Sequence, residues 1–221
     1  MIKTSRALLS EFLGSAILAA TVVGSGIAAE QLSPHQVGLE LLENSLATAG
    51  ILYVLITLLG PVSGAHFNPV VSFVDAALHT RNWWRAFSYF PFQVAGCSAG
   101  ALLANAMFAL PLGEISTHHR ASTPHLLAEV VATAGLILVI FGLARVGRAA
   151  ATAAAVASYI GAAYFFTSST SVANPAIAVG RMFSNSFAGI APASVPGFVA
   201  MEIVGGLLGL GLVSFLFTDH E

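Results

Sequence analysis

Long runs of apolar residues, separated by short polar segments and by segments containing Pro or Gly, dominate the chain. Six of these runs are long enough to cross a bilayer as helices, because about 20 residues span its hydrocarbon core. They lie near residues 7–29, 39–59, 86–109, 124–144, 150–170 and 196–217. Breakers such as Gly60-Pro61, Pro111 and Pro124 lie where helix ends are expected. The pattern therefore predicts an all-α membrane protein with six transmembrane helices.

Two further apolar stretches, residues 61–78 and 171–187, are too long for turns and too short to span. Each contains an Asn-Pro pair, at Asn68-Pro69 and Asn174-Pro175, which opens a run that can be helical to about Leu78 and Asn185. Asn is a favoured helix cap, and Pro suits the first helical position because its missing N–H would be unpaired there anyway. Ten helical residues cover roughly 15 Å, half of the hydrocarbon core. One such pair alone more often begins a turn, but two predict re-entrant half-helices that start near the membrane midplane.

The two pairs belong to an internal repeat. Asn174 follows Asn68 by 106 positions, and Glu129 follows Glu11 by 118. Three spans plus one half-helix make an odd number of crossings, so the second copy is expected to lie upside down relative to the first. We therefore expect one transmembrane domain over residues 1–221, with inverted repeats over about 1–110 and 120–221.

Composition supports a membrane location and excludes other classes of protein. Of 221 residues, 57% are apolar and only 8% are charged, whereas about a quarter of the residues of a soluble domain are charged. The net charge of −2 contains no block of like charges, so nucleic-acid binding is not expected. No Ser-His-acid or paired-carboxylate pattern is evident, and His118, His119 and His125 lack the carboxylate or Cys partners of a metal site. We expect neither an enzyme nor a bound cofactor or metal.

The basic residues predict the orientation. Since cytoplasmic loops carry an excess of Lys and Arg, the side with more of them is expected to face the cytoplasm. That side carries Lys3, Arg6, Arg81, Arg85, Arg145 and Arg148, and the other side carries Arg120 and Arg181. Both termini are therefore expected to be cytoplasmic. The uncharged run from Phe12 to Ala29 is longer than the apolar region of a signal peptide, so we expect the first helix to be retained.

The motifs resemble those of the aquaporin, or major intrinsic protein, family. Residues Ser63 to Val70 are SGAHFNPV, and Asn174-Pro175-Ala176 repeats the Asn-Pro pair, with Glu11 and Glu129 at matching places. The resemblance covers nearly the whole chain, with Val70 in place of the usual Ala. It implies an hourglass fold of six spans and two half-helices, with one pore per subunit, in a homotetramer in the bacterial inner membrane.

Two half-helix N-termini that meet at the midplane would bring partial positive charge and free N–H donors to one point. Cations are disfavoured there, and the amides of two Asn residues can donate to a passing water or hydroxylated solute. The predicted midplane station consists of Asn68, Pro69, Val70, Asn174, Pro175 and Ala176.

The family's narrowest pore position is set by four residues, which spacing from the two Asn residues places at Thr48, Ala162, Ser171 and Ile177. Most members carry an aromatic residue among them and Arg directly after the second motif, and this sequence has neither. The resemblance thus implies a wider, less positive filter whose donors are at most two hydroxyls. Arg181, one helical turn beyond Ile177, is expected to extend to the outer mouth, the alternative being that it folds back into the filter.

Several polar residues are expected to support this site. In the family, the counterparts of Glu11 and Glu129 brace the half-helix loops by accepting backbone N–H bonds. Gln93 and Glu202 occupy matched places and suggest the same role. His66, two residues before the first Asn-Pro pair, is expected to be a packed, neutral imidazole, with a pH-sensitive gate as the alternative.

These patterns predict a passive channel for water and small uncharged solutes in the lipid bilayer. Candidate solutes are glycerol-like polyols, metalloid hydroxides such as arsenous acid, and methylated arsenicals. The arsenic hypothesis rests on a similarity to a bacterial subgroup associated with arsenic detoxification, in which an aliphatic residue also replaces the filter Arg. A coupled secondary transporter built on the inverted repeat remains an alternative, with His66 as its one ionisable candidate beside the Asn residues. A non-conducting adhesion or scaffold protein is a third hypothesis.

Overall fold

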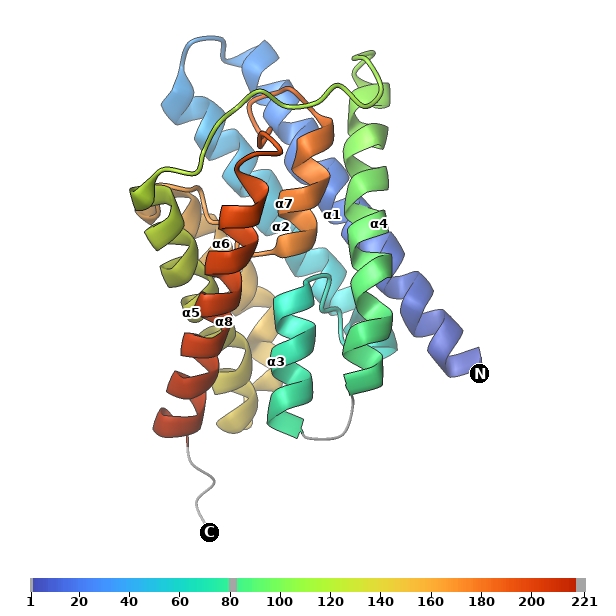
Figure 1. Cartoon of the computed structure of the whole chain (residues 1–221). Helices are drawn as coiled ribbons and strands as arrows, with labels where there is room; N and C mark the ends of the chain where they lie inside the picture. Colours follow the sequence, from blue (N-terminus) through green and yellow to red (C-terminus); the bar gives the residue numbers. More distant parts are fainter. Residues whose placement is uncertain (1, 80–82, 218–221) are drawn as a thin grey trace.

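The computed structural model describes residues 2–79 and 83–217, and every regular element in that part of the chain is helical. Six long helices form the bundle, and two short helices, α3 and α7, lie within it (Figure 1). The long helices are α1 (Ile2–Leu32), α2 (Val37–Ser63), α4 (Trp83–Met107), α5 (Thr123–Arg145), α6 (Thr152–Phe166) and α8 (Val195–Leu216). The short ones are α3 (Pro69–His79) and α7 (Pro175–Gly180), with 3-10 turns η1 (Ala149–Ala151) before α6 and η2 (Arg181–Phe183) after α7. The predicted fold class is confirmed.

Five of the long helices are long and apolar enough to cross a membrane, and α4 is the exception. With 25 residues, α4 is roughly 37 Å long, which exceeds the hydrocarbon thickness. It is less apolar because it carries Trp, Tyr, Pro and polar residues, including the fully buried Gln93. Helix α1 begins and α8 ends at the same end of the bundle (Figure 1). Of the basic residues predicted to lie there, Arg81 is outside the described residues.

The half-helices α3 and α7 extend from opposite ends of the bundle, and their first residues face each other in its middle (Figure 1). Helix α3 has the predicted extent, but α7 is shorter than the predicted run to Asn185. The chain tightens into η2 after Gly180, a poor helix former, and Ser184 is already extended. The carbonyl of Arg181 accepts a bond from the Ile190 N–H at 3.2 Å, because the chain turns back over the end of α7.

Glycines let the long helices pack closely in two matching pairs, α1 with α4 and α5 with α8. On α4, a Cβ at Gly100 would lie 2.9 Å from the backbone nitrogen of Ala20. On α8, a Cβ at Gly209 would lie 2.7 Å from Cβ of Ile137. Such contacts require a residue without a side chain and fix how the repeats pack.

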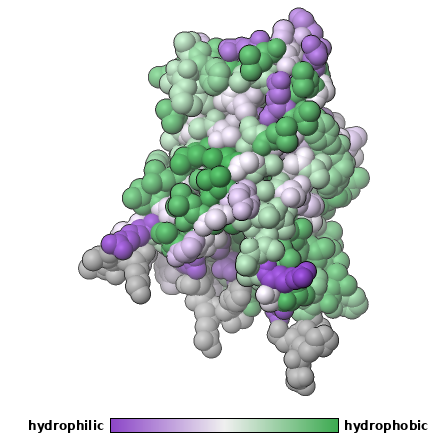
Figure 2. All heavy atoms as spheres, turned by 180° about the vertical axis from the view of Figure 1, so that it is seen from behind, coloured by the Kyte–Doolittle hydropathy of each residue, from purple (hydrophilic) through white to green (hydrophobic). Residues whose placement is uncertain are grey.

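The outer face of the bundle is suited to lipid. Figure 2 shows hydrophobic side chains over the middle of one face and hydrophilic ones toward its upper and lower ends. Large apolar residues of several helices are exposed in the single chain, for example Leu58 at 65%, Leu207 at 63% and Phe215 at 80%. A soluble monomer rarely exposes so much contiguous apolar surface, whereas a bilayer covers it.

We expect Gly209→Ala to lower the melting temperature in detergent by several degrees. The added methyl group must displace Ile137 or the α5 backbone, and overpacking of this kind costs about 1–3 kcal/mol. Gly211→Ala on the same helix is the matched control, since a Cβ there meets nothing within 4 Å. Equal melting temperatures for the two variants would show that the helix contact is not close.

Candidate functional site

The two Asn-Pro motifs hold each other at the centre of the bundle. The Asn68 side chain donates from Nδ2 to the Ala173 carbonyl at 2.7 Å, and Asn174 donates from Nδ2 to the Phe67 carbonyl at 2.8 Å. Each Asn Oδ1 also caps its own half-helix, accepting from the N–H of Val70 at 2.9 Å or of Ala176 at 3.0 Å. Each half-helix is therefore capped by its own Asn and tied to the loop that precedes the other.

The loops that lead into the half-helices have an unusual backbone. Ala65, Phe67, Ser171 and Ala173 have φ values of 51°, 48°, 52° and 47°. These are left-handed conformations, which cost a residue with a side chain about 1–2 kcal/mol. The same positions are affected in both repeats, so the loops are built alike and need similar support.

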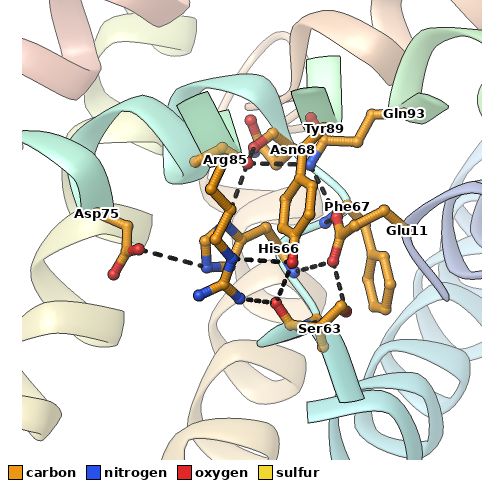
Figure 3. A network of polar contacts seen from close by, with 11 residues as sticks. Glu11, Ser63, His66, Phe67, Asn68, Asp75, Arg85, Tyr89 and Gln93 are labelled. Carbon is orange, nitrogen blue, oxygen red and sulfur yellow. Dashed lines mark hydrogen bonds and ion pairs between the residues drawn. The ribbon is translucent and has the colours of Figure 1, made fainter. Parts of the chain in front are cut away.

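Buried carboxylates supply that support. Glu11 of α1 accepts from the N–H of His66 at 3.0 Å and of Phe67 at 2.7 Å (Figure 3). Glu129 of α5 accepts from Val172 at 3.0 Å and from Ala173 at 2.7 Å. Both carboxylates are fully buried, and these charge-assisted bonds offset the backbone strain.

A second layer of polar groups surrounds the first loop. Gln93 donates from Nε2 to Glu11 at 2.8 Å and to the Ser72 hydroxyl at 3.0 Å. The carbonyl of Ser63 accepts from Arg85 and, at 2.8 Å, from the Tyr89 hydroxyl (Figure 3). The end of α2 and the start of α4 are thereby joined beside the loop.

His66 belongs to this layer and also lines a cavity beside the Asn motifs, which is described below. Its Nδ1 lies 3.0 Å from the Ser72 hydroxyl, and its Nε2 lies 3.9 Å from the carboxylate of Asp75. The ring packs edge-on against Tyr89, with 5.6 Å between centroids. These contacts orient the imidazole on the α3 side of the Asn motifs.

Val70, which directly follows the first Asn-Pro pair, is accommodated by α8. Its side chain packs against Gly206, which offers no side chain of its own. The larger residue in the motif is therefore matched by a small one on the neighbouring helix, and the start of α3 keeps its position.

A cavity of about 80 Å³ adjoins the Asn motifs, which is room for several water molecules. Its lining combines aliphatic side chains with polar side chains and loop backbone. The aliphatic residues include Leu18, Val22, Leu52, Ile56, Leu136, Ile140, Val156 and Ile160, and the polar residues include Thr48, Asn68, Tyr164, Ser171, Asn174 and Arg181. None of the described residues that line the cavity is Asp or Glu.

Three of the four predicted filter positions, Thr48, Ser171 and Ile177, line this cavity, and Ala162 does not. The prediction for Ala162 is wrong because this residue is exposed on the outside of α6. Residues at a spacing of four, Ile160 and Tyr164, face the cavity, and a residue midway between them points to the opposite side of the helix. The Tyr164 hydroxyl lies 3.0 Å from that of Thr48.

Arg181 does not extend to the outer mouth as predicted. Its side chain is only 3% exposed, lines the cavity, and donates from Nε to the carbonyl of Ala188. The loop after η2 folds over it, and Arg120 donates from the neighbouring loop to the Phe187 carbonyl at 2.6 Å. Burial and the nearby Arg181 charge lower the pKa of Arg120 to about 10. The expectations of a less positive lining and of at most two hydroxyl donors are therefore wrong.

Comparison with known proteins identifies relatives over most of the chain. The model of the family described as Major intrinsic protein matches residues 1–173. Aquaglyceroporin AqpS of Rhizobium meliloti (strain 1021) is 45% identical over 212 residues, which cover 96% of this chain and 90% of that protein. Aquaporin Z of Photorhabdus laumondii is 26% identical over 238 residues, which cover 98% and 99%. The crystal structure of the aquaglyceroporin from Plasmodium falciparum has the same fold, with a TM-score of 0.73 at 18% identity over 95% of each chain.

We expect Glu11→Gln to destabilise the protein. Each Glu11 oxygen accepts two bonds, and the amide nitrogen of Gln cannot accept from an N–H donor. A buried donor left without its acceptor costs about 1–3 kcal/mol, which would lower the melting temperature in detergent by several degrees. Glu30→Gln, an exposed position on the same helix, is the control and should leave the melting temperature unchanged. If Glu11→Gln and Glu30→Gln have the same melting temperature, the Glu11 carboxylate does not support the loop.

Proposed function

The chain belongs to the major intrinsic protein family, and from this premise we propose that it is a passive membrane channel for water and small uncharged solutes. The solutes we propose are glycerol-like polyols and metalloid hydroxides such as arsenous acid, with methylated arsenicals included. The observation that carries the proposal is the cavity that adjoins both Asn motifs and whose lining combines polar groups with aliphatic residues. The 45% identical relative, named an aquaglyceroporin, supports the choice of solutes.

The wall of the cavity fits a molecule that is partly polar and partly apolar. Hydroxyl groups of a solute can exchange hydrogen bonds with Thr48, Tyr164, Ser171 and the Asn amides, while its carbon face or its metalloid lies against the aliphatic residues. Each Asn NH2 group carries two hydrogens, and its bond to the opposite loop uses one. The second hydrogen can donate to the oxygen of a solute and so replace part of its hydration.

The electrostatics of the site favour neutral solutes over cations. The positive ends of α3 and α7 point to the centre (Figure 1), and Arg181 adds a full charge to the lining of the cavity. A cation would leave its hydration shell for a lining that offers no carboxylate among the described residues. We infer a passive mechanism because, of the described carboxyl and imidazole groups near the Asn motifs, only His66 lines the cavity. Glu202 bonds the Asn174 N–H but is not among the lining residues, so there is little to couple solute movement to an ion.

Ile177 follows the second motif directly and contributes an apolar side chain to the lining. We propose that the filter consists of Thr48, Ser171 and Ile177 together with Tyr164 and Arg181, the two residues that the spacing argument missed. Because Ile177 places an apolar side chain directly after the motif, we propose that the filter accepts solutes broader than water.

The protein is integral to a membrane, and we propose that this is the bacterial inner membrane with both termini in the cytoplasm. The basic residues near the start of α1, near the start of α4 and near the end of α5 support this orientation. We also propose a homotetramer with one pore in each subunit, as in the family.

Transport into proteoliposomes tests the channel directly. We expect glycerol and arsenous acid to flow down their gradients without saturation at low concentration, alongside rapid water flow, when measured by stopped-flow light scattering. Collapse of ion gradients with ionophores should leave these rates unchanged. Flux no faster than in empty liposomes would contradict the channel and favour a scaffold, and flux that stops with the ion gradient would favour a coupled transporter.

We expect Ile177→Arg to lower glycerol and arsenous acid flux about tenfold, an added barrier of about 1.4 kcal/mol, while lowering water flux less. The long, charged side chain would narrow the aliphatic part of the filter, which matters more for a large solute than for water. Ile177→Val, which keeps an apolar side chain, is the matched control and should retain both fluxes. Equal losses of solute and water flux in the Arg variant would contradict the filter assignment.

A further inference from the structure

The loops that precede α3 and α7 are held by nearly the same hydrogen bonds in the two repeats. Glu11 receives the N–H groups of residues 66 and 67 at 3.0 and 2.7 Å, and Glu129 receives those of residues 172 and 173 at the same two distances. The hydroxyl of Ser63 accepts from the N–H two residues later, and so does the hydroxyl of Ser169. The environment of one carboxylate is therefore a guide to that of the other.

The repeats differ in the residue that approaches each carboxylate from the neighbouring helix. In the first repeat Gln93 of α4 donates from its amide to Glu11 at 2.8 Å, and it must present its NH2 group because a carboxylate only accepts. In the second repeat the matching position on α8 is Glu202. Its carboxyl group accepts from the N–H of Asn174, which is adjacent to the Ala173 N–H that bonds Glu129, so the two carboxyl groups are neighbours. An acid thus occupies the place of an amide donor.

The two oxygens of Glu202 have different surroundings. Oε1 accepts from the N–H of Asn174 at 2.9 Å, whereas Oε2 is buried and receives no bond from any donor among the described residues. Both carboxyl groups are fully buried. An ionised Glu202 would place a second negative charge against Glu129 in a medium of low dielectric constant and would leave Oε2 unsatisfied.

We propose that Glu202 is a neutral carboxylic acid that donates its Oε2 hydrogen to the Glu129 carboxylate, as Gln93 donates to Glu11. The proton removes the repulsion between the two groups and satisfies Oε2 in one step. The charged groups that face Glu202 are Glu129 on α5 and Arg181 beyond α7. With Glu202 neutral, the single charge of Glu129 is opposed to that of Arg181, and this region carries no excess negative charge beside the positive end of α7.

Glu202 is in this proposal a positioning residue for the second Asn motif. It holds the Asn174 N–H through one oxygen and the Glu129 carboxylate through the other, so the left-handed loop is fixed from two sides. The inference concerns a protonation state and does not depend on which solute the channel carries, so it can fail while the proposed function stands.

Infrared spectroscopy of the reconstituted protein at neutral pH tests the proposal. The wild type should show the carbonyl stretch of a protonated carboxylic acid, and Glu202→Gln should lose that band. Gln93→Glu is the mirrored variant, which should gain such a band because the new acid would donate to Glu11 in the same way. A wild-type spectrum without a band that depends on residue 202 overturns the proposal.

Thermal stability gives a second measurement. Because Gln is an isostere of the protonated acid, Glu202→Gln should fold and melt within about 2 °C of the wild type. Glu202→Leu keeps the bulk but cannot accept from Asn174 or donate to Glu129, so it should melt about 5 °C or more below the wild type. A Gln variant that fails to fold, or that loses as much stability as the Leu variant, would show that the ionised carboxylate is required and would overturn the proposal.

Discussion

The reciprocal hydrogen bonds between Asn68 and Asn174 and the opposite loops are the constraint on which the site depends. Each Asn points its amide at a carbonyl of a left-handed residue, Phe67 or Ala173, so neither loop can relax without losing the contact of the other. Irregular backbone of this kind is tolerated at membrane depth where it is buried in protein or lines a wet cavity. The buried carboxylates are the means by which the chain satisfies the N–H groups that such loops leave free of helical partners.

This constraint also contributes to the mixed lining of the cavity. The two loops bring their backbone and the Asn amides to the lining, whereas α1, α2, α5 and α6 contribute Leu, Val and Ile, with Thr48 and Tyr164 as polar residues among them. A lining that combines polar groups with aliphatic side chains is thus a consequence of building a membrane site from two half-helices within a helical bundle.

The sequence was informative where a feature depends on a few neighbouring residues. The Asn-Pro pairs predicted where α3 and α7 begin because capping and the missing Pro N–H are local effects. The end of α7 was misjudged, because it depends on the loop that returns from residue 184 to Ile190 and bonds to Arg181. Ala162 was misplaced because a position estimated from spacing alone can be wrong by two residues, and on a helix two residues reverse the direction of a side chain.

Arg181 shows why the chemistry of a filter cannot be inferred from one motif position. The residue directly after the second motif is Ile177 and not Arg, as the sequence shows. The cavity nevertheless contains an Arg side chain in its lining, that of Arg181. An Arg side chain is long enough to act a helical turn from its own backbone, and whether it turns inward depends on the partner available to it. Here the Ala188 carbonyl holds Nε, so the guanidinium stays buried at the lining with Tyr164. The lining of the cavity therefore combines the apolar side chain of Ile177 with the charge of Arg181.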